Sequence, residues 1–308
     1  MSRLTLACLC FVSMLVLGSL WAGQPLSMLP EARLAAAEQA ADPTIDQVLD
    51  LADRYVVGYV ERLPLLLATE TYSQWTENLD EVNRAWHRTL ISEFALVRLG
   101  SGDDWAAYRD TYKVGNARLR DATDRIERLF VQGADVAGHA AARRLSNDSA
   151  AYNFASIGKA FNASTIPLFF LRPASRPRFT HKKIGEGAIS GVPTWRLEYV
   201  ESRRPTLFRS PEGFDLPVQG TFWISPADGR VLQTHMEIDM RTASASVKND
   251  TSASIRVTYK PDPVDGVLVP AEMLETYEFL KPQPFGGKDA RTRVNCTATY
   301  AGYKRPKR

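Results

Sequence analysis

Three polar side chains alternate along one stretch of the chain and could do chemistry together. His235, Glu237 and Asp239 are two positions apart, so in a strand they share one face with about 6.6 Å between neighbours. Imidazole and carboxylate groups at this spacing could bind a metal ion. The solvent face of a half-buried strand requires the same polar alternation. We expect the solvent face, and predict no metal site.

Other polar features offer no catalytic arrangement. The pair Arg109-Asp110 and the turn Arg203 to Thr206 are charged, and we expect structural ion pairs there. No Gly-x-Ser-x-Gly, His-Glu-x-x-His or Walker sequence occurs, and the four histidines lie on separate segments. We therefore predict no catalytic residue and no cofactor, and a hydrolase of unknown type is only the third hypothesis.

Large apolar side chains in predicted strands indicate a hydrophobic site instead. A curved sheet with helices against it can leave an apolar hollow. We expect strands near the sheet centre to line the hollow with Trp195, Leu197, Phe222 and Ile224. At the edge of the sheet we expect Leu168 and Phe170 to line it. The alternative is that these side chains fill the core.

The stretch from Pro217 to Leu280 predicts antiparallel strands. Runs rich in Val, Ile, Thr, Tyr and Phe are broken there by Pro, Asp and Gly. Residues 226–229 (PADG) suit a tight turn with Gly229 in the left-handed region, so a hairpin is expected. In its second strand the inward side chains are predicted to be Leu232, Met236, Ile238 and Met240.

The remaining elements complete an α+β class. Apolar residues recurring at three and four positions predict a helix over 42–61. Three strands (65–75, 86–99 and 105–114) form a meander, and helices are expected over 121–130, 134–145 and, as a continuation, 152–161. From Pro167 the chain returns to sheet, including residues 168–171, and the last strand covers 291–303. We predict a curved antiparallel sheet with a leading helix and inserted helices packed on its concave side.

The N-terminal residues are typical of a secretory signal peptide. Arg3 precedes an apolar run from Leu4 to Trp21, and small residues follow. We predict a signal peptide over 1–22, a flexible leader over 23–43, one domain over 44–303 and a basic tail over 304–308. The predicted location is the periplasm or the extracellular medium. The run is also long enough to span a bilayer, so an uncleaved anchor is the alternative.

Cysteine content and charge exclude other classes. After cleavage only Cys296 remains, which rules out an internal disulfide and a cysteine metal cluster. The formal net charge of +3 is too small to indicate nucleic acid as a partner.

Several longer motifs carry a resemblance. RTLISEFALVRL, DRIERLF, RRPTLFR, GTFWISPADGRVLQT and VTYKPDPVDGVLVPAEMLETYEF together resemble a family of uncharacterised exported bacterial proteins, over most of residues 44–303. The order of elements is also similar to the LolA-like lipoprotein-carrier fold. That resemblance implies a half-open β-barrel whose helices plug the mouth and which holds acyl chains.

These observations predict a binding protein. The expected ligand is a hydrophobic small molecule or a lipoprotein acyl chain, held between sheet and helices, with transient membrane contact. The alternative is an envelope scaffold protein that has a filled core and a protein partner but no ligand. An apolar cavity of at least about 300 Å³ would distinguish the two.

Overall fold

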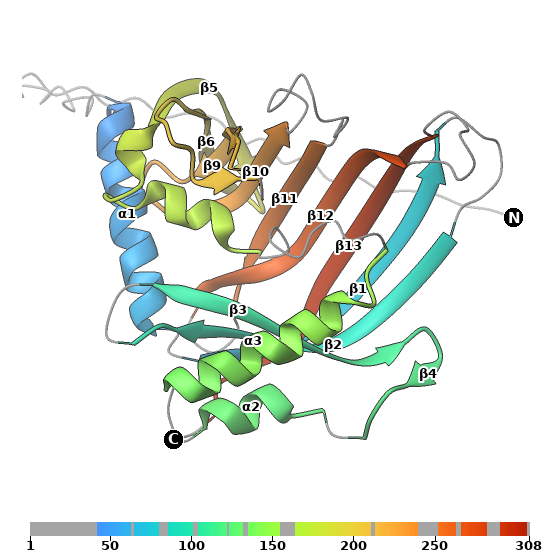
Figure 1. The fold of residues 1–308 in the computed structure, drawn as a ribbon. Coiled ribbons are helices and arrows are strands. Elements are labelled where there is room, and N and C mark those ends of the chain that lie inside the picture. Colours follow the sequence, from blue (N-terminus) through green and yellow to red (C-terminus); the bar gives the residue numbers. More distant parts are fainter. Residues whose placement is uncertain are drawn as a thin grey trace, which may run out of the picture. The chain divides into compact units, whose positions relative to one another are not determined.

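The computed structural model describes residues 42–62, 65–79, 86–100, 104–121, 123–131, 135–154, 164–210, 213–239, 252–262, 266–281 and 290–306. The predicted signal peptide and leader lie almost entirely outside these residues. Residues 43–308 group into one compact unit (Figure 1). Its helices are α1 (Ile45–Arg62), α2 (Arg125–Phe130), α3 (Val136–Ala150) and the short 3-10 helices η1 (Ile166–Leu171) and η2 (Arg176–Arg178). Its strands are β1 (Leu65–Asn78), β2 (Trp86–Arg98), β3 (Trp105–Val114), β4 (Ala117–Arg118), β5 (Phe179–Ile189), β6 (Val192–Glu201), β7 (Phe208–Arg209), β8 (Asp215–Leu216), β9 (Val218–Ile224), β10 (Val231–Asp239), β11 (Ser252–Pro261), β12 (Leu268–Lys281) and β13 (Ala290–Lys304).

One antiparallel sheet of eleven strands dominates this unit. Its order is β4-β3-β2-β1-β13-β12-β11-β10-β9-β6-β5, while β7 pairs only with β8. The predicted meander β1-β2-β3 is confirmed, and the last strand, β13, joins it by pairing with β1. Because the order begins at β4 and ends at β5, the sheet is open. The predicted α+β class with an antiparallel sheet is confirmed.

The short helix η1 touches both ends of this sheet. Phe169 of η1 stacks on Trp105 of β3 with ring centroids 3.9 Å apart. The next residue, Phe170, lies 5.7 Å from Tyr199 of β6. In a flat sheet β3 and β6 would be about 38 Å apart, since eight spacings of roughly 4.8 Å separate them. Six residues of 3-10 helix span only about 12 Å. The sheet is therefore strongly curved around η1.

The β9–β10 hairpin has the predicted turn and register. Gly229 has φ +74° and donates its N–H to the Ser225 carbonyl at 2.9 Å. A Cβ on Gly229 would lie 2.2 Å from the backbone carbon of Leu51, so this turn packs directly against α1. The predicted inward residues Leu232, Met236 and Ile238 are 1–4% exposed, which confirms the register. Met240 lies outside the described residues.

Side chains of β1–β3 pack into cores on both faces of the sheet. Tyr72 and Phe94 belong to the main cluster, together with residues of α1 and η1. Leu67, Val97 and Tyr108 alternate with them and pack with α2 and α3 in a second cluster. The inserted helices thus divide between the two faces, because β1–β3 bury apolar side chains on both sides.

The outer edge of β3 is covered by α3. Ser146 Oγ and Ser149 Oγ of α3 accept the N–H groups of Arg109 and Thr111, each at 2.8 Å. These two donors would otherwise be unpaired at a sheet edge, where a foreign strand could attach. Two serines therefore complete the hydrogen bonding of this edge.

The carboxylate of Glu93 on β2 caps the N-terminus of α2. Glu93 Oε2 and Oε1 accept the N–H groups of Ile126 and Glu127 at 2.8 Å and 3.0 Å. Asp124 at the N-cap position makes no side-chain capping bond, so Glu93 satisfies the first donors of the helix from outside it. Burial raises the pKa of Glu93 to about 7, although these two N–H bonds act in the opposite direction.

Four sequence predictions about elements were wrong. Residues 168–171 form part of η1 rather than a strand, because Pro167 lies in its first turn and favours helical backbone there. Strands β6 and β9 lie second and third from the β5 end of the sheet, not near its centre. The helix predicted over 121–130 begins only at Arg125, and the one predicted to end at 145 runs to Ala150. Most of 152–161 lies outside the described residues.

The beginning of the predicted basic tail is part of the fold. Strand β13 continues to Lys304, whose Nζ donates to Glu127 of α2. Arg305 forms an ion pair with the buried Asp262. These two charges therefore fix the end of the last strand.

Candidate functional site

The six residues predicted to bind a ligand meet beneath η1. Two of them lie on η1 itself, and four lie on β6 and β9 in directly opposed pairs, Trp195 with Ile224 and Leu197 with Phe222. All are buried, with at most 6% exposed: Leu168, Phe170, Trp195, Leu197, Phe222 and Ile224. The structure thus brings these side chains together, and their contact with a ligand stays a prediction.

Aromatic rings interlock around these residues. Phe222 stacks on Tyr199 with ring centroids 4.4 Å apart, and Phe170 lies 5.0 Å from Phe179 of β5. The Tyr199 hydroxyl donates to the His235 carbonyl at 2.9 Å. A Cβ on Gly220 would lie 2.0 Å from that carbonyl oxygen and 2.7 Å from the Tyr199 hydroxyl. The glycine of the GTFWI motif therefore makes room for the central ring.

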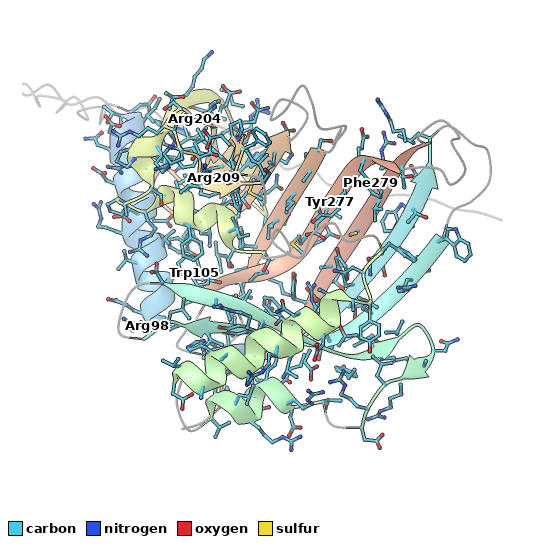
Figure 2. All side chains as sticks on the ribbon, viewed as in Figure 1. Arg98, Trp105, Arg204, Arg209, Tyr277 and Phe279 are labelled. Carbon is cyan, nitrogen blue, oxygen red and sulfur yellow. The ribbon has the colours of Figure 1, made fainter. Side chains whose placement is uncertain are left out.

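Polar contacts hold η1 over the apolar layer. On its N-terminal side, Trp105 Nε1 donates to Thr165 Oγ1 at 2.7 Å, and the Tyr259 hydroxyl donates to the Ser164 carbonyl at 2.9 Å. On its C-terminal side, Arg172 Nε lies 3.8 Å from Asp53 of α1. Trp105 itself lies at the start of β3, beside α1 (Figure 2). We call η1 with these contacts the cover.

A buried polar cluster lies on the same face of the sheet. Arg109 of β3 donates twice to the carboxylate of Glu70 on β1, once at 2.6 Å from its NH2 group. Nearby, the hydroxyls of Tyr72 and Tyr277 donate to the two oxygens of Glu275 at 2.5 Å and 3.0 Å. Burial raises the pKa of Glu275 to about 7. Sequence reasoning missed this cluster, because its members lie on separate strands.

The charged pair Arg109-Asp110 divides between the two faces of β3. Arg109 binds Glu70 in the main cluster, whereas Asp110 accepts from Arg120 at 2.9 Å on the other face. Neighbouring strand residues point to opposite faces, so the two form separate ion pairs. Both residues therefore form ion pairs within the fold, and structural ion pairs are what the sequence predicted here.

A groove of about 560 Å³ opens at the ends of β6, β9, β10 and β11. We call it the outer groove. Val200, Gln219, Glu237 and Ser254 form one cross-strand row in it. Their buried neighbours along the strands, Val218, Ile238 and Ala253, line it as well. Its remaining walls include Arg204 and Pro217. The predicted ligand residues do not line it.

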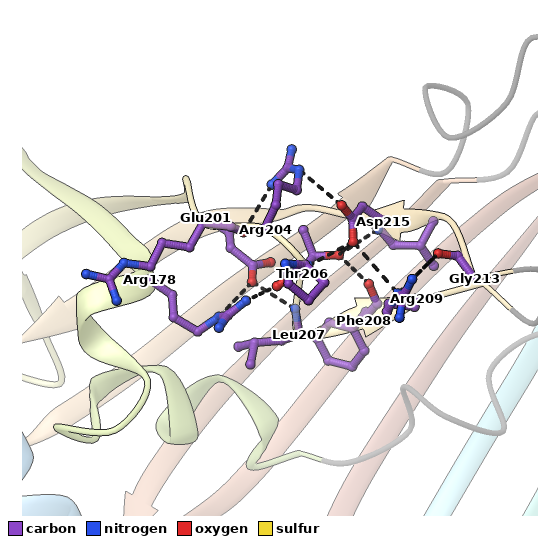
Figure 3. A network of polar contacts seen from close by, with 12 residues as sticks. Arg178, Glu201, Arg204, Thr206, Leu207, Phe208, Arg209, Gly213 and Asp215 are labelled. Atoms are coloured by element: carbon purple, nitrogen blue, oxygen red, sulfur yellow. Dashed lines mark hydrogen bonds and ion pairs between the residues drawn. The ribbon is translucent and has the colours of Figure 1, made fainter.

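A polar network holds the β7–β8 hairpin beside this groove (Figure 3). Glu201 accepts the Leu207 N–H at 2.8 Å and the Arg178 Nε at 3.3 Å. Asp215 accepts the Thr206 N–H at 2.9 Å and pairs with Arg204 Nε at 3.5 Å. The Thr206 bond, aided by the neighbouring arginines, lowers the pKa of Asp215. The predicted Arg203–Thr206 turn is therefore fixed by acidic partners on both sides.

Of the three alternating residues of β10, Glu237 lines the outer groove, His235 lies beside it, and the side chain of Asp239 is outside the described part of the structure. His235 Nε2 lies 2.9 Å from Ser254 Oγ and 3.5 Å from Glu237 Oε1. Burial lowers the pKa of His235. In a Ser-His-Asp triad the nucleophile and the carboxylate bind opposite ring nitrogens. Here both contacts are on one nitrogen, so the arrangement is not a triad.

Two further findings concern metal binding and membrane-spanning helices. Within the described residues no group of three or more His, Cys, Asp or Glu side chains could hold a metal ion. In the same part of the chain no helix is long and apolar enough to cross a membrane.

Comparisons with known proteins give distant structural similarity. No protein-family model and no curated protein match the chain. A LolA superfamily protein from Nitrosomonas europaea is 11% identical, with 85% of this chain and 93% of that chain covered and a TM-score of 0.28. A DUF1329 family protein from Desulfovibrio piger is 10% identical, with 84% and 92% covered and a TM-score of 0.31.

A third similar structure is a domain described as an outer membrane lipoprotein-sorting protein, from Vibrio parahaemolyticus. It is 12% identical, with 83% of this chain and 91% of that chain covered and a TM-score of 0.32. The distant LolA-like resemblance noted from the sequence is thus found again among solved structures. Similarity at these TM-scores says nothing about the ligand or partner of this chain.

Proposed function

We propose that this is an exported binding protein for a hydrophobic ligand, such as a lipid or a lipoprotein acyl chain. The observation that carries the proposal is the apolar layer under the cover. Side chains of η1, β6 and β9 that are at most 6% exposed meet there, and η1, a six-residue 3-10 helix, lies over them. Short 3-10 segments have poor hydrogen-bond geometry, so η1 is the part of the boundary that we propose opens.

Uptake of a ligand requires the cover to move. Phe170 and Leu168 occupy the space above β6 and β9, and an acyl chain would replace their contacts with apolar contacts of its own. Burial of apolar surface contributes about 25 cal/mol per Å², so apolar contacts of the acyl chain would offset lost η1 packing in proportion to the area that they bury. The sequence resemblance to LolA-like carriers implies the same ligand class, and the N-terminal sequence supports export.

A scaffold protein without a ligand is the second candidate. It is favoured by the interlocked rings of Tyr199, Phe222, Phe170 and Phe179, whose neighbouring centroids are 4.4–5.7 Å apart. A layer that is filled in this way needs no ligand for stability. Measured binding decides between the two candidates.

The test is binding of a fluorescent fatty-acid probe, with mass spectrometry of lipid that co-purifies from the native envelope. We expect the unmodified protein to bind the probe and Phe222→Ala to retain it less well. Phe130→Ala is the matched control, because Phe130 is also buried but lies in the second cluster with α2 and α3. No probe binding by the unmodified protein, together with no co-purified lipid, would leave the scaffold candidate standing.

A further inference from the structure

The outer groove has the dimensions of a small-molecule site and lies at the ends of four strands, apart from the six predicted ligand residues. Its volume of about 560 Å³ is within the usual range for ligand pockets, roughly 300–1,000 Å³. Val200, which lines it, is 40% exposed. Pro217 from the turn before β9 adds a second apolar surface. The groove thus offers an apolar wall to a ligand that need not enter the core.

Two of the charged side chains at the groove have partners of opposite charge, and a third, Glu237, differs from them. Arg204 pairs with Asp215, and Glu201 accepts from Arg178. Glu237, whose side chain is 45% exposed, has Gln219 Nε2 at 3.0 Å and His235 Nε2 at 3.5 Å. Burial keeps the pKa of His235 below its usual value, so at neutral pH the imidazole is uncharged. Within the described residues, Glu237 therefore has no cationic partner.

We infer that the outer groove binds a small amphiphilic amine. Its ammonium group donates to the carboxylate of Glu237 and to Ser254 Oγ, which lies on the directly opposed residue of β11. Its apolar chain lies along Val200 and Pro217. An anionic ligand of the same shape would be repelled by the carboxylate of Glu237. A neutral ligand would leave that carboxylate partly desolvated and unpaired.

This site is independent of the proposed carrier function. The ligand of the carrier is expected under η1, among residues that the groove does not share. Loss of fatty-acid binding would leave amine binding untouched, and the reverse also holds.

The test compares three probes of equal chain length, hexylamine, hexanol and hexanoate, by titration calorimetry on the purified protein at pH 7.5. Amide NMR shifts then locate the contact. We expect hexylamine to bind more tightly than the other two and to shift the side-chain amide of Gln219. Glu237→Gln keeps the shape and removes the charge. A charge-assisted hydrogen bond predicts a loss of about ten- to hundredfold in hexylamine affinity.

Glu198→Gln is the matched control. Glu198 is an exposed carboxylate on the same face of β6, in the neighbouring cross-strand row and outside the groove. Its substitution should leave hexylamine binding unchanged. The inference is overturned if hexylamine does not bind, if hexanol or hexanoate binds equally well, or if Glu237→Gln and Glu198→Gln have the same effect. Both side chains are exposed enough that the variants should unfold at the same temperature as the unmodified protein.

Discussion

The substitution Glu275→Gln should stabilise the protein at alkaline pH. Glu275 is 2% exposed, and burial raises its pKa from 4.5 to about 7. A folded state that holds its proton more tightly than the unfolded state loses stability as the pH rises between these two values. Below about pH 4.5 both states are protonated, and the penalty vanishes. Above pH 7 the penalty is complete, on the order of 3 kcal/mol.

The variant removes this titration and keeps one of the two accepted hydrogen bonds. The amide oxygen of Gln accepts from Tyr72 or Tyr277, and its NH2 group can donate to the hydroxyl oxygen of the other. Between pH 5 and pH 8 the free energy of unfolding of Glu275→Gln, relative to the unmodified protein, should therefore rise by about 2–3 kcal/mol. Glu93 titrates in the same window, but its contribution is common to both proteins and cancels in the difference.

Urea unfolding at pH 5, 6, 7 and 8 measures this difference. Glu272→Gln, an exposed carboxylate on the same strand, is the control and should show no trend. The reasoning is refuted if the difference between Glu275→Gln and the unmodified protein does not change with pH. The same holds if the variant is the less stable at pH 8. Either result would mean that Glu275 is ionised in the folded protein, with Arg109 compensating its charge.

Three further substitutions test the packing. Gly229→Ala should destabilise more than Gly266→Ala, because both have φ near +70° but only Gly229 would place a Cβ against Leu51; equal losses in urea unfolding would exclude the α1 contact. Glu93→Ala should cost about 1 kcal/mol through loss of its capping bonds, and an unchanged midpoint would show that α2 does not need them. Phe222→Ala should cost about 3–5 kcal/mol if its rings are fully packed, and a loss below about 2 kcal/mol would indicate a looser layer.

Local patterns predicted most of the strands and the hairpin. From Leu232 to Ile238 the residues of β10 alternate between buried and half-buried, and the buried ones are apolar except Thr234, so period two was sufficient for the register. Gly229 and Pro226 mark the turn, because few other residues suit its backbone. The prediction for residues 168–171 was wrong because the local pattern there was ambiguous. An apolar run of four is compatible with a strand or a buried helical turn, and only Pro167 favoured the turn.

Side chains could be assigned to the candidate site only where alternation along a strand decides which of them point inward. Alternation predicted inward positions for Trp195, Leu197, Phe222 and Ile224, on two neighbouring strands, and all four are buried. Glu275 and its two tyrosine partners could not be found, because Tyr72 lies 203 residues away in the chain. The only signal in the sequence was a glutamate at an inward position of β12, between Met273 and Tyr277. A charged residue in such a position requires partners, but the sequence does not say which.

The two candidate sites share strands and are linked through them. When η1 moves away from the inner side chains of β6 and β9, the backbone of these strands has to stay rigid. Tyr199 supplies part of that rigidity, because its hydroxyl crosses Gly220 to bond the His235 carbonyl. The side chain of the same His235 lies against Ser254 and Glu237 of the outer groove. His235 thus bonds the inner layer through its backbone and contacts two residues of the outer groove through its imidazole. Gly220→Ala would disturb both sites at once, whereas Glu237→Gln should disturb only the outer one.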